Sequence, residues 1–275
     1  MRFISVFIGL FFYTIADGQY YYNDILGTQQ SNTQYQLLRS NKVKKVIATS
    51  FEEDHSVTAG FLLEQELSLD GKKLITHSTN ISGKTMETTS FYEAGKLKLT
   101  QSYSNGIENK MEYGYDEKGR IQSFTLTTTD TALKYKWVER REWHYNALGQ
   151  VSDVLKIKNK TDSSIAVMLI DELGNPVEEH WKKKNKDTET FYYYYNVAKQ
   201  LTDIVHFNSR LKKLVPDYVY EYNEKGKPIQ MNQLAASGTY FIWKYAYNEK
   251  GLKINETCTD NKKIFIGNIE YRYEF

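Results

Sequence analysis

Residues 113–121 read YGYDEKGRI, and this short stretch decides the expected fold. Tyr113 and Tyr115 are two residues apart, so in an extended chain both side chains lie on the same face of a strand. Asp116 can accept hydrogen bonds from nearby backbone amides and open a turn. Gly119 can adopt the left-handed conformation that closes a short loop with a bulge. The stretch therefore predicts a β-hairpin with an aromatic first strand.

The same pattern recurs along most of the chain. YEYNEKGK (220–227) and YAYNEKGL (245–252) are close copies, and WHYNALGQV (143–151) is a looser one. MLIDELG (168–174) keeps the turn without the aromatics, whereas YYYNVAKQL (193–201) keeps the aromatics and has Lys199 in place of glycine. LSLDG (67–71) and FYEAG (91–95) are degenerate members. The turn positions are 24 to 30 residues apart, a regularity that indicates a repeat protein.

Each repeat has room for two strands and two turns and none for a connecting helix, so its strands must be antiparallel. Eight hairpins give about sixteen strands, and residues 43–51 and 264–275 each add one. One face of the strands is uniformly large and the other is mixed and partly polar, which predicts one covered and one solvated face. The predicted fold is all-β: an antiparallel hairpin array of about 8 units and 16–18 strands, curled into a roll, sandwich or barrel-like sheet.

Residues 113–121 resemble the YD repeat of Rhs and teneurin-type proteins, in the form Tyr-x-Tyr-Asp-x-x-Gly-Arg-Ile. The resemblance extends in spaced copies over roughly residues 60–275, with a looser and mostly longer spacing than a YD repeat. It implies a large curled β-shell. It carries over no catalytic residue, and the chain has no evident self-cleavage segment or C-terminal toxin domain.

The N-terminal residues predict export. Arg2, an apolar run and the small residues Ala16 and Gly18 describe a signal peptide over residues 1–18. Residues 19–42 form a lead-in in which residues 23–41 contain one short helical segment with Tyr35, Leu37 and Leu38. Residues 43–275 form a single β-repeat domain, and the protein is expected in the periplasm, on the cell surface or outside the cell. With 36 Lys and Arg against 34 Asp and Glu, nucleic acid is not an expected partner.

No sequence motif for catalysis, a metal or a cofactor is present. The five histidines have no metal-binding spacing, and the acidic clusters 52–54, 178–179 and 187–189 are interpreted as solvated charges near turns. Cys258, the single cysteine, is interpreted as a small strand residue. We therefore expect no enzyme activity, no cofactor and no metal.

The tyrosines are the sharpest candidates for ligand contact, because a tyrosine offers a flat apolar ring and a hydroxyl. They are also strong strand formers, so a structural role is the favoured interpretation. The most aromatic copies supply the candidate ligand-binding residues, which are Tyr193, Tyr195, Tyr220, Tyr222, Trp243, Tyr245 and Tyr247.

Three functions stay open. The first is an exported, non-enzymatic repeat scaffold that binds a glycan or a protein of the cell envelope. The second is an outer-membrane β-barrel, favoured by the alternation of Ile269, Tyr271 and Tyr273 up to the aromatic Phe275 and opposed by the polar second strands and a mean hydropathy of −0.61. The third is a polysaccharide-active enzyme that uses paired carboxylates.

Overall fold

The computed structural model describes residues 19–80, 83–208, 212–234 and 238–275, so the predicted signal peptide lies outside the described residues. A π-helical turn, η1 (Tyr21–Leu26), runs into the helix α1 (Gly27–Ser40). The first strands are β1 (Lys45–Phe51), β2 (Leu62–Leu67), β3 (Lys73–Thr79), β4 (Thr85–Glu93), β5 (Lys96–Ser104) and β6 (Ile107–Tyr115). The next are β7 (Ile121–Asp130), β8 (Tyr135–Tyr145), β9 (Val151–Lys158), β10 (Asp162–Ile170), β11 (Pro176–Lys183) and β12 (Lys186–Tyr195). The last are β13 (Leu201–Asn208), β14 (Lys213–Tyr222), β15 (Pro228–Leu234), β16 (Tyr240–Tyr247), β17 (Lys253–Asp260) and β18 (Phe265–Glu274).

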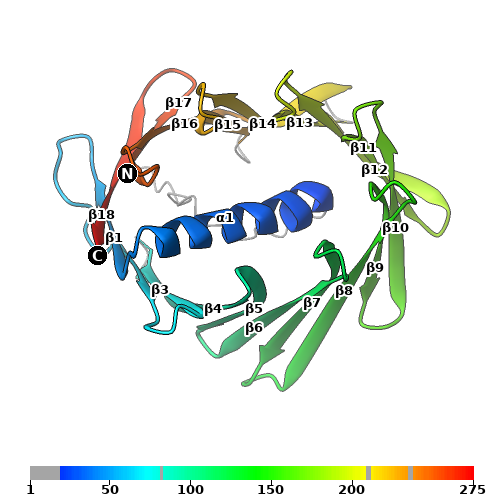
Figure 1. Ribbon diagram of the computed structural model, residues 1–275, viewed down its shortest axis with the longest axis horizontal. Helices are drawn as coiled ribbons and strands as arrows, with labels where there is room; N and C mark the ends of the chain where they lie inside the picture. The colour runs from blue at the N-terminus through cyan, green and yellow to red at the C-terminus, as the bar shows by residue number, and fades with distance from the viewer. Residues whose placement is uncertain (1–18, 81–82, 209–211, 235–237) are drawn as a thin grey trace.

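The eighteen strands form one closed antiparallel barrel (Figure 1). Each strand pairs with its neighbours in sequence, and β1 pairs with β18 from Lys45↔Glu274 to Phe51↔Asn268, which closes the ring. The all-β, antiparallel and barrel-like prediction is confirmed. Eighteen strands are more than eight hairpins alone provide, because the two flanking strands β1 and β18 complete the ring.

The repeated turns have the predicted geometry. In the β6–β7 turn, the amide of Gly119 donates to the carbonyl of Asp116 at 2.9 Å, and Gly119 has a φ of +77°. A shift in register between Gly114 and Tyr115 marks the expected bulge. Lys199, which replaces the glycine in its repeat, adopts the same left-handed conformation with a φ of +60°. The turn geometry therefore persists where the glycine is lost.

The two faces of the barrel differ as predicted. In β8, the alternating residues Glu139, Arg141 and Trp143 are buried and face the lumen, whereas Arg140 and His144, at alternate positions on the other face, are exposed. The tyrosines of the repeat also face the lumen, where Tyr113 and Tyr193 are buried. Most aromatic residues of the repeats therefore line the inside of the barrel, and the outside is mixed, with charged residues such as Arg140 and exposed apolar ones such as Ile165 and Tyr194.

A ladder of hydrogen bonds explains why the second tyrosine of each pair recurs. Its hydroxyl donates to the backbone carbonyl two residues after the turn position of the preceding repeat. Six such bonds of 2.6–2.8 Å join Tyr115 to Leu97, Tyr145 to Ile121, Tyr195 to Pro176, Tyr222 to Leu201, Tyr247 to Pro228 and Tyr273 to Lys253. Each repeat is thus fastened to the one before it.

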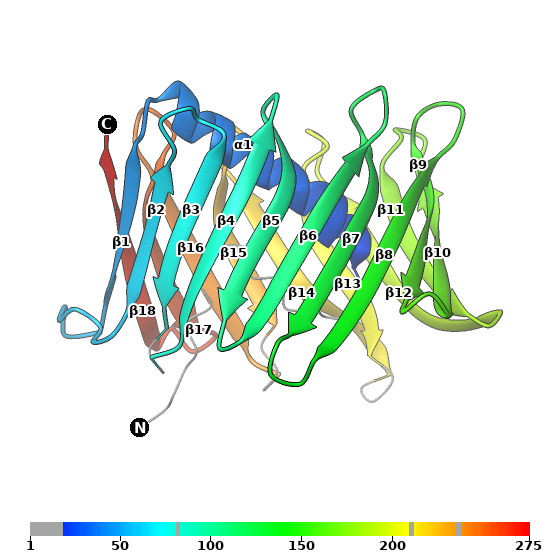
Figure 2. The same ribbon diagram turned by 90° about the horizontal axis from the view of Figure 1, so that it is seen from below.

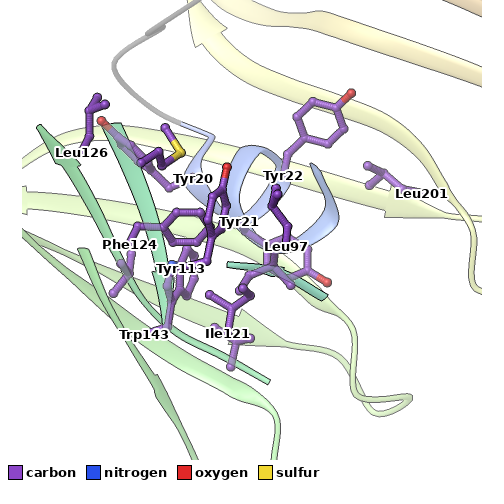
Figure 3. Packing of buried hydrophobic residues seen from close by; sticks show 14 of the residues in the cluster. Tyr20, Tyr21, Tyr22, Leu97, Tyr113, Ile121, Phe124, Leu126, Trp143 and Leu201 are labelled. Carbon is purple, nitrogen blue, oxygen red and sulfur yellow. The ribbon is translucent and has the colours of Figure 1, made fainter. Parts of the chain in front are cut away.

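The lumen contains the N-terminal segment, residues 20–40, here called the plug, and one side of α1, which includes Gln30 and Thr33, is exposed. It lies obliquely across the barrel, with its C-terminal end at the rim where β1 begins (Figures 1 and 2). At that end the ring of Tyr35 stacks on Tyr92, with ring centroids 3.6 Å apart and planes 2° apart. At the other end Tyr20 packs against Trp181, Tyr21 against Tyr193 and Tyr22 against Tyr218, with ring centroids 5.0–5.4 Å apart. Figure 3 shows Tyr21 beside Tyr113 in the same buried cluster. The predicted short helical segment is confirmed and is longer than expected.

Candidate ligand pocket at the barrel mouth

Glu179, on β11, binds the start of the plug. Its carboxylate is fully buried and accepts from the backbone amides of Tyr20 at 3.0 Å and Tyr21 at 3.1 Å. It also accepts from Trp181 Nε1 at 2.6 Å and the Tyr193 hydroxyl at 2.5 Å. The first backbone amides of a helix have no partner within the helix. The carboxylate of Glu179 therefore caps the start of η1. Burial raises the pKa of Glu179 above its usual range.

Asp24 makes the second polar anchor of the plug. One oxygen lies 2.9 Å from Arg141 Nη1, and the other accepts from Trp143 Nε1 at 3.1 Å. Arg141 also stacks over the ring of Tyr20, 4.8 Å from its centroid. Burial raises the pKa of Asp24 to about 7, and the neighbouring Arg141 limits the rise. The wall and the plug therefore share a buried charge network.

This network corrects one interpretation of the sequence. Glu178 and Glu179 were both expected to be solvated, yet Glu179 is fully buried, because consecutive strand residues face opposite sides and Glu179 shares its side with Trp181. Glu139 and Asp24 are buried as well. Sequence reasoning missed all three, and the partners of Asp24 and Glu179 across the interface of plug and wall lie more than a hundred residues away in sequence.

A cavity of about 310 Å³ opens at the mouth of the barrel, between one flank of the plug and the turns of the repeats. Its volume is at the lower end of the range of roughly 300–1,000 Å³ that is typical of small-molecule sites. It is lined by Tyr21, Ile25, Thr28, Gln29, Asn32, Lys96, Tyr115, Gly119, Arg120, Ile121, Tyr145, Gly149, Gln150, Val151, Gly174 and Pro176. We call it the mouth pocket.

Two cations and two tyrosine rings shape the mouth pocket. The guanidinium of Arg120 lies 3.9 Å from the centroid of the Tyr145 ring and pairs with Asp116 at 2.6 Å. Lys96 Nζ lies 5.3 Å from the centroid of Tyr115 and donates to the carbonyl of Gly119 at 3.1 Å. None of the lining residues is a carboxylate. The pocket is therefore rich in hydrogen-bond donors and positively charged.

One hydroxyl on the plug side of the mouth pocket has no hydrogen-bond partner among the described residues. Thr28 is 1% exposed, and its Oγ1 makes no hydrogen bond with any described residue. Its neighbour along the plug, Asn32, accepts from the backbone amide of Leu97 at 2.8 Å through Oδ1. The plug side of the mouth pocket thus contains both engaged and unengaged polar groups.

The candidate residues from the sequence lie elsewhere. They belong to β12, β14 and β16 and face the lumen, and none of them lines the mouth pocket. The hydroxyl of Tyr193 is bound to Glu179, that of Tyr220 to Tyr22, and that of Tyr222 to the backbone. Trp243 is 4% exposed. These contacts stabilise the barrel and the plug, and direct ligand contact by Tyr193, Tyr195, Tyr220, Tyr222, Trp243, Tyr245 and Tyr247 stays a prediction.

Other sites give little sign of chemistry. Within the described ranges, no group of three or more His, Cys, Asp and Glu side chains is arranged to hold a metal ion. Cys258 is 1% exposed, and burial together with Glu256 raises its pKa to about 12, which agrees with a small strand residue rather than a reactive thiol. No helix in the described part of the chain is both long and apolar enough to cross a membrane.

Comparisons with known proteins give distant structural likenesses. No family model matches the chain, and no curated protein is significantly similar to it. A crystal structure of a porin-like protein from Bacteroides uniformis is 11% identical, with a TM-score of 0.40, over 84% of this chain and 98% of that one. A porin-like protein from Bacteroides vulgatus is 10% identical, with a TM-score of 0.31, over 84% and 98%. The Photorhabdus luminescens Tc holotoxin pore is 9% identical, with a TM-score of 0.31, over 84% of this chain and 17% of that one.

Proposed function

We propose that the protein is an exported scaffold, a water-exposed β-barrel filled by its own N-terminal plug, that binds a glycan at the barrel mouth. The main observation in support of the proposal is that the plug lies inside the barrel and is bound to its wall. Its backbone and side chains are bound by wall residues that are buried, including Glu179, Arg141 and Trp143. A lumen occupied in this way supports a rigid binding scaffold better than an open channel.

The outward face supports a barrel that is surrounded by water. Lys110, Arg140 and Lys244 lie near the middle of their strands and next to buried residues of the opposite face. A lysine or arginine on the lipid face at the bilayer midplane costs about 2–4 kcal/mol. Outward apolar residues lie over β9 and β10, where Leu155 pairs with Ile165, and again over β12 to β14, where Tyr194, Phe207 and Leu214 are exposed. Because charged residues such as Lys110, Arg140 and Lys244 lie on the same outer face, these side chains do not make the uninterrupted apolar band that a membrane barrel requires.

An outer-membrane barrel is the second candidate, and closure of the sheet favours it over an open array of repeats. The pairing of β1 with β18 removes both edges of the sheet, as in membrane barrels. A direct test is to express residues 19–275 and purify them without detergent. A monodisperse monomer of unchanged β-content supports the water-exposed scaffold, whereas aggregation that detergent reverses favours the membrane barrel.

Binding is tested separately. The purified protein is immobilised and exposed to native cell-envelope extract, with a heat-denatured sample of the same protein as the control. Retention of one glycan or glycoconjugate by the folded sample alone supports the proposal. Retention of nothing across a range of salt and pH would contradict it.

The enzyme hypothesis has less support. The buried carboxylate of Asp24 is bound to Arg141 and Trp143 of the wall, and that of Glu179 to backbone amides of the plug, so neither is placed to meet a substrate. A glycosidase needs two carboxyl groups that flank an accessible cleft. Absence of new reducing ends after incubation with a panel of polysaccharides is the expected result.

A further inference from the structure

We propose that the mouth pocket binds a carboxylate-bearing sugar, of the uronic acid type, through Lys96, Thr28 and the amide side chains around them. This inference rests on the proposed function and names the class of glycan. Uncharged sugars and free proteins are the alternatives that the test must separate.

The charge of the pocket is the first argument. Lys96 and Arg120 line it and no carboxylate does. The charge of Arg120 is offset by Asp116, which lies 2.6 Å from the guanidinium and is outside the lining set. Lys96 Nζ is bound to a backbone carbonyl, which leaves its positive charge without a carboxylate partner among the described residues. A buried or half-buried cation of this kind favours an anionic ligand.

The donors around Lys96 fit the rest of a sugar. Gln29, Asn32 and Gln150 place amide groups on the lining, and an amide can donate to and accept from sugar hydroxyls. The oxygens of Asn32 and Gln150 already accept from the Leu97 amide and from Asn146 Nδ2. The rings of Tyr115 and Tyr145 supply flat apolar surface, which suits the C–H face of a pyranose. The volume of about 310 Å³ fits one sugar unit of an oligosaccharide, whose other units would extend out of the barrel mouth, rather than a folded protein segment.

Thr28 is the independent observation. Its Oγ1 is buried without a hydrogen-bond partner among the described residues, at a residue that lines the pocket. A buried hydroxyl without a partner is unfavourable in an empty protein and becomes favourable when a ligand supplies the missing bond.

The test uses residues 19–275 and two forms of one probe, trigalacturonate and its methyl ester, measured by calorimetry. The free acid is expected to bind about tenfold or more tightly than the ester, because the ester removes the charged hydrogen bonds. Its affinity is expected to fall as the ionic strength rises. Equal affinities for the two forms would overturn the assignment to a carboxylate.

Two variants test whether trigalacturonate binds in the mouth pocket. Lys96→Met keeps the aliphatic stem and removes the charge, and Thr28→Val keeps the shape and removes the hydroxyl. Each is expected to weaken binding of trigalacturonate about tenfold. Thr28→Val is also expected to leave the melting temperature unchanged or higher, because it removes an unpaired buried hydroxyl. A lower melting temperature with unchanged affinity would overturn the role of Thr28.

Matched controls make the same two substitutions outside the mouth pocket. Thr33→Val lies on an exposed side of α1, and Lys225→Met lies in an exposed turn outside the pocket. Both should bind trigalacturonate as the parent does, and equal losses in these controls would contradict the site. If trigalacturonate does not bind while the envelope capture still retains another glycan, the uronate assignment fails and the proposed function stands.

Discussion

At the scale of single residues, the barrel depends on a few buried polar groups that its repeat does not encode. Glu179 accepts four hydrogen bonds, two of them from the backbone of the plug. Its neighbour Glu178 faces outward and contacts His180 at 2.5 Å. Two adjacent glutamates in one strand therefore have opposite roles, which gives a matched pair for mutation.

Glu179→Gln is expected to destabilise the protein by about 3 kcal/mol or more, because an amide nitrogen cannot accept hydrogen bonds and the buried donors of the plug lose a partner. Glu178→Gln is expected to change stability by less than about 1 kcal/mol, since its partner lies at the surface. Urea unfolding followed by circular dichroism measures both. Similar midpoints for the two variants would contradict the capping role of Glu179.

Asp24 predicts a dependence of stability on pH. Its pKa in the folded protein is raised to about 7, against about 4 in an unfolded chain, so folding favours the protonated form. The stabilisation is fully present below about pH 4 and is lost as the pH rises towards 7. Asp24→Asn should flatten this decline in the free energy of unfolding. An unchanged pH profile in the variant would count against a raised pKa at Asp24.

At the scale of elements, the tyrosine ladder joins hairpins that are adjacent in sequence. Tyr222→Phe keeps the ring and removes the bond to the Leu201 carbonyl, so a loss of about 1 kcal/mol is expected. Tyr194, 48% exposed on the outer face of β12, provides the control Tyr194→Phe. Thermal unfolding of the two variants measures the difference. No loss at Tyr222 would mean that the ladder contributes shape and no net stability.

The hairpins could be predicted from the sequence because their signals are local. Tyr113, Tyr115 and Gly119 specify two strands and a turn within nine residues. Closure could not be predicted, because it needs Lys45 to pair with Glu274 across more than two hundred residues. The plug was recognised only in part, because α1 is mostly polar and its apolar contacts are few, chiefly Tyr35 and Leu38. The mouth pocket could not be predicted either, because its residues come from the plug and from several turns that are far apart in sequence.

At the scale of the whole molecule, the barrel closes around an interior that is aromatic and hydroxyl-rich rather than aliphatic. The lumen holds the tyrosines of successive repeats together with those of the plug. Burial raises the pKa of Tyr145, Tyr222 and Tyr247, each to about 12. The raised pKa recurs at tyrosines of several repeats, so it depends on the closed barrel as a whole. High pH therefore tests whether the barrel is closed around its plug.

The expected result is cooperative alkaline unfolding. Tyrosine in an unfolded chain ionises near pH 10, so the raised values mean that the stabilisation is complete below about pH 10 and is lost as the pH rises towards 12. Tyrosinate absorbance and the circular dichroism of the strands should therefore change together above pH 10. The double variant Tyr222→Phe with Tyr247→Phe removes two of these ionisations, so its free energy of unfolding should decrease less steeply as the pH rises above 10. The same variant is expected to be less stable at neutral pH, because it loses two hydrogen bonds of the ladder. Ionisation of nearly all tyrosines near pH 10 with the strands intact would show that the lumen is open to water and the plug is not seated.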